Sequence, residues 1–440
     1  MVKKVLVLGA GLVSRPLVQY LLDVGDIEVT VASRTVSKAS ALIGSHPRGR
    51  ALPLNVDETE KLSQLVRVHD LVISLLPYVH HVVVAKLCLE FGRHLVTTSY
   101  VGDAMKALDG PARKKRVLFL NEIGLDPGID HMSAMRIIHE VQERGGEIAG
   151  FSSYCGGLPA PDANDNPFGY KFSWSPKAVL MAGRNTAKFL KDGVMVDIPG
   201  SELFDNFWPV KIEGLDEFDG YPNRDSMPYR ELYKIDSTKT MFRGTLRNKG
   251  WCLTLRKMVQ LGLIDDSERR DLAGLTFAQL TAKLIGRPDA AALRNHAAAF
   301  LRVAENSSVI TNLEWLGIFT DEPLPEGKSI MDVIAARMLE KMSYRPGERD
   351  MIVLFHEFDA NYPDHREKIT STLIDFGIPD GDSAMARTVS LPAAIATRMI
   401  LHGEITLTGV EIPAVPEVYE PVLDELEELN IKCIEKTVRI

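Results

Sequence analysis

The chain has 440 residues and a formal net charge of −8, from 51 Lys and Arg residues against 59 Asp and Glu residues. Hydrophobic residues make up 45% and charged residues 25%, an ordinary globular composition that excludes a disordered or collagen-like chain. The acidic balance argues against nonspecific nucleic-acid binding, which needs a basic face. At about 150 residues per domain, the length suggests about three domains.

Cysteine spacing and apolar runs indicate the setting of the protein. The four cysteines are far apart and form no CxxC pair: Cys88, Cys155, Cys252 and Cys433. This favours a reduced, cytoplasmic setting over a zinc ribbon or a disulfide framework. No stretch reaches the about 20 apolar residues that a membrane span needs, so we expect no membrane partner. The apolar run Val5–Val13 lacks a cleavage site and is interrupted by glycines, so a buried strand is predicted there instead of a signal peptide.

The first 130 residues alternate apolar strands with helices. Val5–Leu8 is typical of a strand buried on both faces, and the helix after it carries Pro16 in its first turn and ends at Gly25. Further strands are predicted at Ile27–Ala32, Leu71–Leu75, His94–Thr98 and Val117–Leu120, with a helix at Val79–Phe91. This alternation predicts βαβ units and a parallel sheet.

The pattern changes after Asp130. Strands are predicted at Ile148–Cys155 and Thr240–Arg247, and the long Gly-, Pro- and Asn-rich segment between them is expected to be loops that carry function. Residues 257–343 have Ala and Leu at helical spacing and predict a helical insertion. Later elements are predicted as strands at Met351–Phe358, Lys368–Phe376 and Lys432–Val438 and as helices at Met385–Leu401 and Val418–Leu429. These last elements are too few for a core of their own, so we expect them to pack on the earlier domains.

A glycine-rich loop joins the first strand to the first helix. Gly9 permits the tight turn, and Gly11 lets the backbone approach a pyrophosphate at the positive helix N-terminus. Ser14 replaces the third glycine of the GxGxxG pattern, which weakens the match. A tight turn without a ligand is the alternative.

The end of the second predicted strand distinguishes NAD from NADP. NAD enzymes usually carry Asp or Glu there, whereas this chain has Ala32-Ser33-Arg34-Thr35. An arginine would pair with a ribose 2′-phosphate, although Arg34 is also compatible with an ordinary surface position. The ends of later strands, at Asn55, Leu75-Leu76 and Thr98-Ser99, are where the rest of a dinucleotide would lie.

Several segments are unusual for structure alone and together resemble one family. They are NEIGLDPGIDH at 121–131, SYCGGLPAP at 153–161, YKFSWS at 170–175, YPNRDS at 221–226, RGTLR at 243–247 and EWLG at 314–317. In this order they closely resemble the saccharopine dehydrogenases (saccharopine reductases) of the L-glutamate-forming kind, over essentially the whole chain. The chain also resembles the saccharopine dehydrogenase half of the bifunctional lysine-degrading enzymes, which carry an Asp where this chain has Arg34.

The resemblance implies an α/β fold with a Rossmann domain, a second mixed-sheet domain and an all-helical insertion, in agreement with the elements above. The expected Rossmann NADP-binding domain is 1–130 plus about 385–415. The mixed-sheet substrate domain is 131–256 plus about 344–384 and 416–440, and the insertion is 257–343.

The implied reaction is the reversible, NADP(H)-dependent cleavage of saccharopine to glutamate and aminoadipate semialdehyde. The resemblance also implies a homodimer. The implied catalytic residues are Asp126, Cys155 and Tyr100, with no metal. Implied substrate-binding residues are Pro77, Ser99, Tyr100, Asp126, Arg224, Thr245, Leu246 and Arg247. Implied cofactor-binding residues are Gly9, Ala10, Gly11, Leu12, Val13, Ala32, Ser33, Arg34, Thr35, Asn55, Val56, Leu75, Leu76, Thr98, Ser99, Leu125, Asp126, Pro127 and Ser175.

Other interpretations of these residues remain open. Asp126 before Pro127 is also compatible with a helix N-cap, Cys155 with an inert buried thiol, and Arg224 with a local pair to Asp225. His131 is interpreted as a structural histidine at a helix start. Alternative functions are an NAD-linked saccharopine dehydrogenase, a carboxynorspermidine-type imine reductase and a nucleotide-binding regulator without turnover. A polyamine site would call for carboxylates, whereas the arginines of this chain favour saccharopine.

Overall fold

The computed structural model describes residues 2–440. Contacts between Cα atoms divide the chain into two compact units. The first comprises residues 1–147 and 371–436, and the second comprises 148–370 and 437–440.

The first unit is built on a parallel sheet whose strand order is β15-β6-β5-β4-β1-β2-β3. Its strands are β1 (Lys3–Leu8), β2 (Ile27–Ser33), β3 (Gly49–Pro53), β4 (Leu71–Ser74), β5 (His94–Val96), β6 (Leu118–Leu120) and β15 (Gly409–Glu411). Strands β1 to β6 lie in the order 3-2-1-4-5-6, which is the order of a doubly wound dinucleotide-binding sheet. The direction of winding reverses between β1 and β4. The Rossmann prediction is therefore confirmed.

Helices complete the first unit. They are α1 (Ser14–Asp23), α2 (Val36–Ile43), α3 (Thr59–Val68), α4 (His81–Phe91), α5 (Asp103–Lys106), α6 (Asp109–Lys115), α7 (Ile129–Glu143), α15 (Ala384–His402) and α16 (Pro416–Glu428), with a 3₁₀ turn at Tyr78–His80. One core cluster joins α3, α4, α5 and α6 to the strands, with Leu6, Val72 and Phe119 buried beneath the helices. Strand residues at alternate positions supply this face, because side chains along a strand point to opposite sides.

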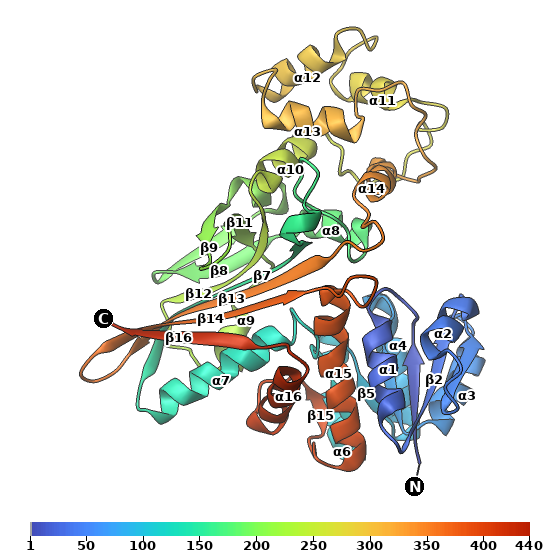
Figure 1. Cartoon of the computed structure of the whole chain (residues 1–440), viewed down its shortest axis with the longest axis vertical. Coiled ribbons are helices and arrows are strands. Elements are labelled where there is room, and N and C mark those ends of the chain that lie inside the picture. The colour runs from blue at the N-terminus through green and yellow to red at the C-terminus, as the bar shows by residue number, and fades with distance from the viewer. Residues whose placement is uncertain (1) are drawn as a thin grey trace. The chain divides into compact units, whose positions relative to one another are not determined.

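The end of the chain returns to the first unit, as predicted. Figure 1 shows α15, in red, running beside α1, in blue. Arg398 on α15 donates to the Tyr20 hydroxyl on α1 (3.0 Å) and to Glu425 on α16 (2.9 Å). Helix α16 packs in turn on α7, where the Tyr419 hydroxyl lies 2.7 Å from His139 Nδ1.

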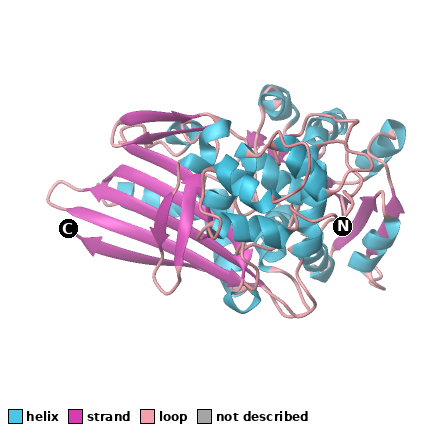
Figure 2. Cartoon of the chain, turned by 90° about the horizontal axis from the view of Figure 1, so that it is seen from above, coloured by secondary structure: helices cyan, strands magenta, loops and turns pink. Residues whose placement is uncertain are grey.

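The second unit contains most of a mixed sheet with the order β10-β11-β12-β7-β13-β14-β16, and β8 joins it through β12 and β9. Its strands are β7 (Glu147–Pro159), β8 (Ala187–Lys191), β9 (Val194–Ile198), β10 (Trp208–Lys211), β11 (Glu217–Pro222), β12 (Thr240–Asn248), β13 (Asp350–Asn361), β14 (Arg366–Phe376) and β16 (Cys433–Arg439). Strand β12 is parallel to β7 and antiparallel to β11. The long strands of this sheet, which run to the C-terminus, are the magenta arrows beside the label C in Figure 2.

The helices of the second unit follow its strands. They are α8 (Pro176–Ala182), α9 (Pro228–Leu232), α10 (Trp251–Gln260), α11 (Phe277–Leu284), α12 (Leu293–Leu301), α13 (Ser308–Leu316) and α14 (Ile330–Lys341), with 3₁₀ turns at Pro161–Ala163 and Gly200–Asp205. Helices α10 to α14 correspond to the predicted helical segment, and α10 begins earlier than expected because it directly follows β12.

The structure differs from the sequence-based expectations in several places. The Gly-, Pro- and Asn-rich segment after β7 was expected to be loops, but it contains β8, β9, β10 and β11. The first helix ends at Asp23 rather than at Gly25, and β5 ends at Val96 rather than at Thr98. The unit boundaries also fall elsewhere than the predicted domain boundaries. Helices α7 and α16 pack together in the first unit, and the helical insertion is grouped with the mixed sheet. The three-domain division stays a prediction.

Candidate active site

The loop after β1 has the geometry of a phosphate-binding turn. Gly9 has φ +111°, and a Cβ there would lie 3.0 Å from the carbonyl oxygen of Leu75, so a side chain would clash with the neighbouring β4 end. The fully buried Ser14 begins α1, and its hydroxyl accepts a hydrogen bond from the Gly11 amide (3.0 Å). This explains how serine replaces the third glycine. The hydroxyl holds the loop at the helix N-terminus, where an anion is favoured.

The segment after β2 carries exposed positive charge. Ser33 ends the strand, and its hydroxyl accepts a hydrogen bond from the Thr35 amide (3.3 Å). Arg34 and Lys38 are exposed, and within residues 2–440 neither has an acidic partner at ion-pair distance. No carboxylate occupies the position that would bind a free ribose hydroxyl. The segment therefore fits a nucleotide with a 2′-phosphate.

The other predicted cofactor residues of the first unit also follow the carboxyl ends of its strands. Asn55 and Val56 follow β3, Leu75 and Leu76 follow β4, Thr98 and Ser99 follow β5, and Leu125 to Pro127 come after β6. The carboxyl edge of a doubly wound sheet is where dinucleotides bind. Ser175 is the exception, because it belongs to the second unit, where its hydroxyl accepts from the Ala178 amide as the N-cap of α8.

Two of the three predicted catalytic residues are in contact. The Tyr100 hydroxyl donates to Asp126 Oδ1 over 2.7 Å, and both side chains are partly exposed. Asp126 lies in a tight turn between Gly124 and Gly128. Gly128 has φ +149°, and a Cβ there would lie 2.0 Å from the Gly124 carbonyl oxygen, so the turn leaves no room for a side chain at this position. Asp126 therefore is not the N-cap of α7, since Gly128 has that position.

His131 is buried in the first turn of α7. Its Nε2 lies 2.9 Å from Glu122 Oε2, and the other oxygen of that carboxylate accepts from the Val101 amide (2.9 Å). Glu122 has φ +56°. These contacts join the segment after β6 to that after β5, which agrees with a structural role for His131.

A histidine network under the same edge was not identified from the sequence. His81 Nδ1 lies 2.9 Å from Ser74 Oγ at the end of β4, and its Nε2 lies 2.8 Å from Ser99 Oγ after β5. Burial lowers the pKa of His81 to about 4, with a smaller contribution from the charge of His80. The ring is therefore neutral at physiological pH and positions the Ser99 hydroxyl. Nothing in the local sequence marks this role, because the contact joins residues from two strand ends.

In the second unit, one face of the sheet carries two of the predicted substrate residues, Thr245 and Arg247. Thr245 on β12 is in register with Cys155 on β7, and Arg243 is in register with Ser153. Since alternate residues share a face, Arg247 lies on this side with Arg243 and Thr245. Leu246 points to the opposite face, where it is fully buried against Gly156. Only the backbone of Leu246 is therefore suited to bind a ligand on the arginine side.

Arg247 is a buried cation without a carboxylate partner. It is 5% exposed, and its guanidinium lies 4.9 Å from the ring centre of Tyr170 and 5.8 Å from that of Trp251. Its Nη1 donates to the Leu246 carbonyl (2.7 Å), and its buried Nε has no hydrogen-bond partner. No acidic side chain among the described residues is at ion-pair distance. A buried charge is costly unless it is paired, so this site calls for an anionic ligand.

The nearest acidic residue along the sheet is used elsewhere. Asp219 on β11 is in register with Arg247, but its Oδ2 accepts from the amides of Gly250 and Cys252 (3.0 and 3.2 Å) at the start of α10. Asp219 thus satisfies a helix N-terminus. The aromatic neighbours of Arg247 and this helix contact were not predicted, because they depend on how distant segments pack.

The remaining predicted residues are placed as follows. Arg224 is exposed at the turn after β11 and has φ +56°, and its carbonyl oxygen accepts from the Lys188 amide (2.9 Å). Arg243 is 5% exposed with its guanidinium 4.2 Å from the Tyr229 ring centre. Cys155 is buried on β7, and Pro77 is exposed after β4. Cys155, Arg224, Thr245 and Arg247 belong to the second unit, whereas Pro77, Ser99, Tyr100 and Asp126 belong to the first.

The described residues, 2–440, offer neither a membrane-spanning helix nor a metal-binding cluster. No helix there is long and apolar enough to cross a membrane. No group of three or more His, Cys, Asp or Glu side chains there is arranged to hold a metal ion.

Comparisons with known proteins point to one family. The family model of the saccharopine dehydrogenase NADP binding domain matches residues 5–120, and that of the saccharopine dehydrogenase C-terminal domain matches residues 124–431. The "Saccharopine dehydrogenase [NADP(+), L-glutamate-forming]" of Pyricularia oryzae is 41% identical over 99% of both chains. The mitochondrial alpha-aminoadipic semialdehyde synthase of Bos taurus is 42% identical over 97% of this chain and 47% of its own length.

A solved structure is similar over nearly the whole chain. Apo saccharopine dehydrogenase (L-Glu forming) from Saccharomyces cerevisiae has a TM-score of 0.91 and 38% identity, covering 99% of this chain and 100% of the other. The sequence motifs, the fold and these comparisons lead to one assignment: the chain belongs to the saccharopine dehydrogenase family.

Proposed function

We propose that the chain is an NADP-dependent saccharopine dehydrogenase of the L-glutamate-forming kind. In one direction it oxidises saccharopine, with water and NADP⁺, to glutamate, aminoadipate semialdehyde and NADPH. In the other it reduces the imine formed from glutamate and the semialdehyde. The observation that carries the proposal is the buried guanidinium of Arg247, which has no carboxylate partner of its own, because saccharopine brings three carboxylates.

The first unit fits the nucleotide. The Gly9 turn leaves no room for a side chain beside Leu75, and the exposed Arg34 and Lys38 have no acidic partners among the described residues. These two cations would hold the 2′-phosphate of NADP(H), and the amides at the start of α1 would hold its pyrophosphate. The nicotinamide, when bound, supplies the hydride chemistry.

Substrate carboxylates are assigned to the second unit. Arg247 binds one carboxylate from between two aromatic rings, and Arg224 and Thr245 bind others. The burial of Arg247 makes its charged hydrogen bonds stronger than they would be in water. The partners Pro77, Ser99, Tyr100 and Asp126 of the first unit and the Leu246 backbone complete the proposed set.

Proton transfer is assigned to Tyr100, Asp126 and Cys155. In the oxidative direction the saccharopine amine must be neutral before hydride leaves the neighbouring carbon, and the water that attacks the resulting iminium must lose a proton. In the reverse direction the amine of glutamate must lose a proton to condense, and the carbinolamine hydroxyl must gain one to leave as water. The 2.7 Å hydrogen bond between Tyr100 and Asp126 makes these two groups a coupled donor and acceptor. Cys155 is buried on the arginine-bearing face of its sheet, and a Cys155→Ser variant with unchanged kcat and pH profile would remove it from the set.

The test is a direct assay of reduced nicotinamide formation from saccharopine with NADP⁺ or NAD⁺, for wild type and Arg34→Asp. We expect a higher kcat/KM with NADP⁺ in the wild type, because Arg34 gains a charge-assisted hydrogen bond worth roughly 1.5–3 kcal/mol. Arg34→Asp should lose most of that preference and keep or improve its activity with NAD⁺. A wild type that prefers NAD⁺ would assign the chain to the NAD-linked saccharopine dehydrogenases instead.

The same assay separates the other candidates. A carboxynorspermidine-type enzyme would turn over a carboxylated polyamine and leave saccharopine unchanged. A nucleotide-binding regulator would bind NADPH with no turnover of either compound.

Assembly and location are also proposals. A homodimer is supported by β16, which ends the order of the mixed sheet and exposes Ile434 and Val438, followed directly by the exposed Ile440. A cytoplasmic location is supported by four buried cysteines that form no disulfide. Light scattering of the wild type and of Val438→Lys tests the first, and microscopy of the tagged protein tests the second.

A further inference from the structure

A pocket of about 420 Å³ lies at the edge of the parallel sheet opposite to the cofactor residues. Its lining comes from the amino-terminal halves of β1 and β2, from β3 and the two residues before it, and from the end of α3 and the residue after it: Lys4, Glu28, Val29, Thr30, Pro47, Arg48, Gly49, Arg50, Leu52, Leu65, Val68 and His69. The glycine loop follows the other end of β1, five residues beyond Lys4 and therefore roughly 15 Å away. The volume of the pocket is within the range of small-ligand sites.

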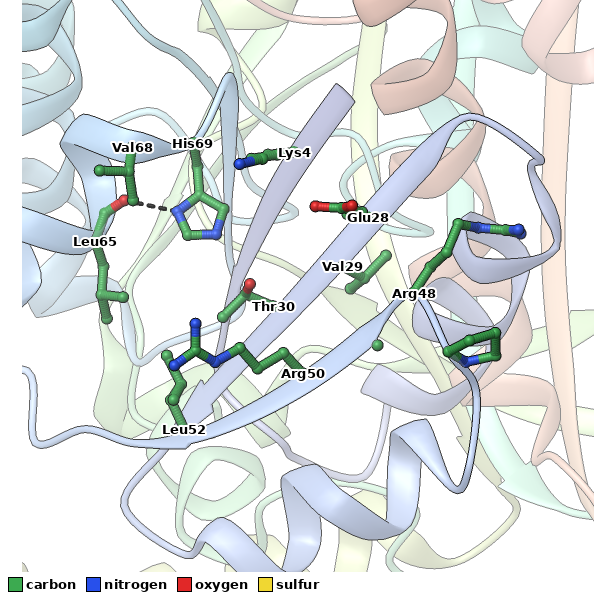
Figure 3. Close-up of a pocket in the computed structure, with 12 residues that line it drawn as sticks. Lys4, Glu28, Val29, Thr30, Arg48, Arg50, Leu52, Leu65, Val68 and His69 are labelled. Carbon is green, nitrogen blue, oxygen red and sulfur yellow. Dashed lines mark hydrogen bonds between the residues drawn. The ribbon is translucent and has the colours of Figure 1, made fainter. Parts of the chain in front are cut away.

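Positive charge converges on one side of this pocket. Figure 3 shows Lys4, Arg50 and His69 around the space in front of Thr30. Thr30 and Arg50 are in register on neighbouring strands, as are Lys4 and Glu28. In the described part of the chain, the side chains of Lys4 and Arg50 have no acidic partner within ion-pair distance. The carboxylate of Glu28 is the one acidic group in the lining, so the pocket carries net positive charge.

His69 adds a nearly buried polar atom to the same side. The residue is 6% exposed, and its Nδ1 lies 2.6 Å from the Leu65 carbonyl oxygen at the end of α3. A carbonyl only accepts, so Nδ1 carries the proton and Nε2 keeps a lone pair when the ring is neutral. No hydrogen bond satisfies Nε2 within residues 2–440. Burial, and then the charges of Lys4 and Arg50, lower the pKa of His69, while its hydrogen bond to Leu65 and the charge of Asp70 oppose this.

Arg48 has a different role at the rim. Its guanidinium donates to the carbonyl oxygens of Ile27 and Leu22, and so closes the C-terminal end of α1. These bonds leave Lys4 and Arg50 as the cations available to a ligand.

We propose that this pocket is a second binding site, separate from the nucleotide and substrate residues, for a small organic anion held by Lys4, Arg50 and His69. The ligand carries a phosphate ester or a carboxylate, because both groups accept several charged hydrogen bonds at once. A bound anion ties together the amino ends of the three strands whose other ends carry the cofactor segments.

The test is calorimetric titration of NADP⁺-saturated enzyme with sulfate and, separately, with succinate. Saturation with NADP⁺ keeps sulfate away from Arg34 and the glycine loop. We expect a saturable site that persists in Arg247→Met and whose Kd is at least about tenfold weaker in Arg50→Gln, which removes one charged hydrogen bond. Tighter binding of sulfate would indicate a phosphate ester as the natural ligand, and tighter binding of succinate a carboxylate.

Matched variants locate the site. Glu28→Gln should tighten anion binding, because it removes the opposing carboxylate, whereas Lys86→Gln on the exposed face of α4 removes a positive charge elsewhere and should change nothing. Arg247→Met should leave the Kd unchanged, which excludes the substrate residues. Glu28, Arg50 and Lys86 are exposed, whereas Arg247 is buried. Thermal unfolding checks that each variant folds.

Acidification gives an independent readout, because sulfate itself does not titrate in this range. Protonated His69 donates through Nε2, so sulfate binding should tighten as the pH falls below neutrality and should lose this dependence in His69→Gln. The charged groups facing His69 are Lys4, Glu28, Arg50 and Asp70. No saturable binding to the wild type, or an equal Kd in Arg50→Gln, would overturn the proposal.

Discussion

Arg247 combines two properties that pull in opposite directions. Its guanidinium is buried, which destabilises the folded chain, and it has no carboxylate partner among the described residues, which leaves it available to a ligand. We expect Arg247→Met to raise the KM for saccharopine at least about tenfold, because a charged hydrogen bond contributes roughly 1.5–3 kcal/mol. The Kd for NADP⁺ should stay nearly constant and the melting temperature should not fall. Steady-state kinetics measure the KM, a binding titration measures the Kd for NADP⁺, and thermal unfolding measures the melting temperature.

Lys249→Met is the matched control for this prediction. Lys249 stands two positions away, its side chain is 75% exposed and it pairs only with Glu217. Its removal should change neither KM nor stability by a measurable amount. If Arg247→Met instead unfolds the protein and leaves the KM of the remaining folded fraction unaltered, Arg247 has a structural role.

The hydrogen bond from Tyr100 to Asp126 carries the second prediction. Removing one hydroxyl in Tyr100→Phe should lower kcat by about 10²-fold, the smaller end of the range for a positioned proton-transfer group, and change the saccharopine KM far less. Asp126→Asn should be at least as damaging, since it removes the acceptor. Single-turnover kinetics with preformed enzyme–NADP⁺ complex isolates the chemical step. Wild-type kcat in Tyr100→Phe would exclude the pair from proton transfer.

At the scale of the element, the turn between β6 and α7 depends on one glycine. Gly128 has φ +149°, and an added Cβ would lie 2.0 Å from the Gly124 carbonyl oxygen. Gly128→Ala should therefore cost on the order of 2–3 kcal/mol of unfolding free energy and displace Asp126, with a loss of kcat. Gly110→Ala is the control, because its Cβ meets nothing within 4 Å inside α6, and we expect it to stabilise by about 0.5–1 kcal/mol. Urea unfolding of both variants distinguishes a special backbone position from a generic effect of alanine.

Helix α4 begins with a histidine that makes stability depend on pH. Burial lowers the pKa of His81 to about 4 in the folded chain, whereas the exposed ring in the unfolded chain titrates near 6.5. Above pH 6.5 neither state binds the proton, so the neutral ring costs nothing. As the pH falls from 6.5 toward 4, the unfolded state binds it first and stability is lost, by up to about 3 kcal/mol.

The His81→Gln variant isolates this contribution from those of the other buried histidines. Its unfolding free energy should fall less steeply over the same pH interval than that of the wild type, whatever its absolute stability. Urea titrations at a series of pH values give both slopes. Parallel slopes would mean that His81 titrates alike in the folded and unfolded chain.

The elements also show what the sequence could and could not predict. The strands of the first unit were predictable because strands buried on both faces are continuous apolar runs, such as Val5–Leu8. Strand β11 was missed because Gly220 and Pro222 belong to loop-forming types, although tertiary packing holds them in a sheet. The cofactor loop follows from glycine spacing. The environment of Arg247 could not be predicted in this way, because its guanidinium lies beside Tyr170 and Trp251, which come from other parts of the chain.

At the scale of the whole molecule, the negative net charge of the chain opposes the binding of both the cofactor and the substrate. The chain carries a net charge of −8, and both NADP(H) and saccharopine are anions, so its long-range field opposes their approach. Binding must therefore come from local cations. Arg34 and Lys38 are exposed, whereas Arg247 is buried, and this difference decides how each contact responds to salt.

Raising the ionic strength should therefore separate cofactor choice from substrate affinity. Screening shortens from about 10 Å at 0.1 M to about 3 Å at 1 M salt, which weakens the exposed contact of Arg34 with a 2′-phosphate far more than a buried contact of Arg247. We expect the ratio of kcat/KM for NADP⁺ over NAD⁺ to fall several-fold over this range, while the KM for saccharopine changes less. Arg34→Met, which removes this contact and adds no charge, should show a ratio that depends less on salt. A ratio that is equally insensitive to salt in the wild type would place the discrimination between the nucleotides at a buried contact, away from Arg34.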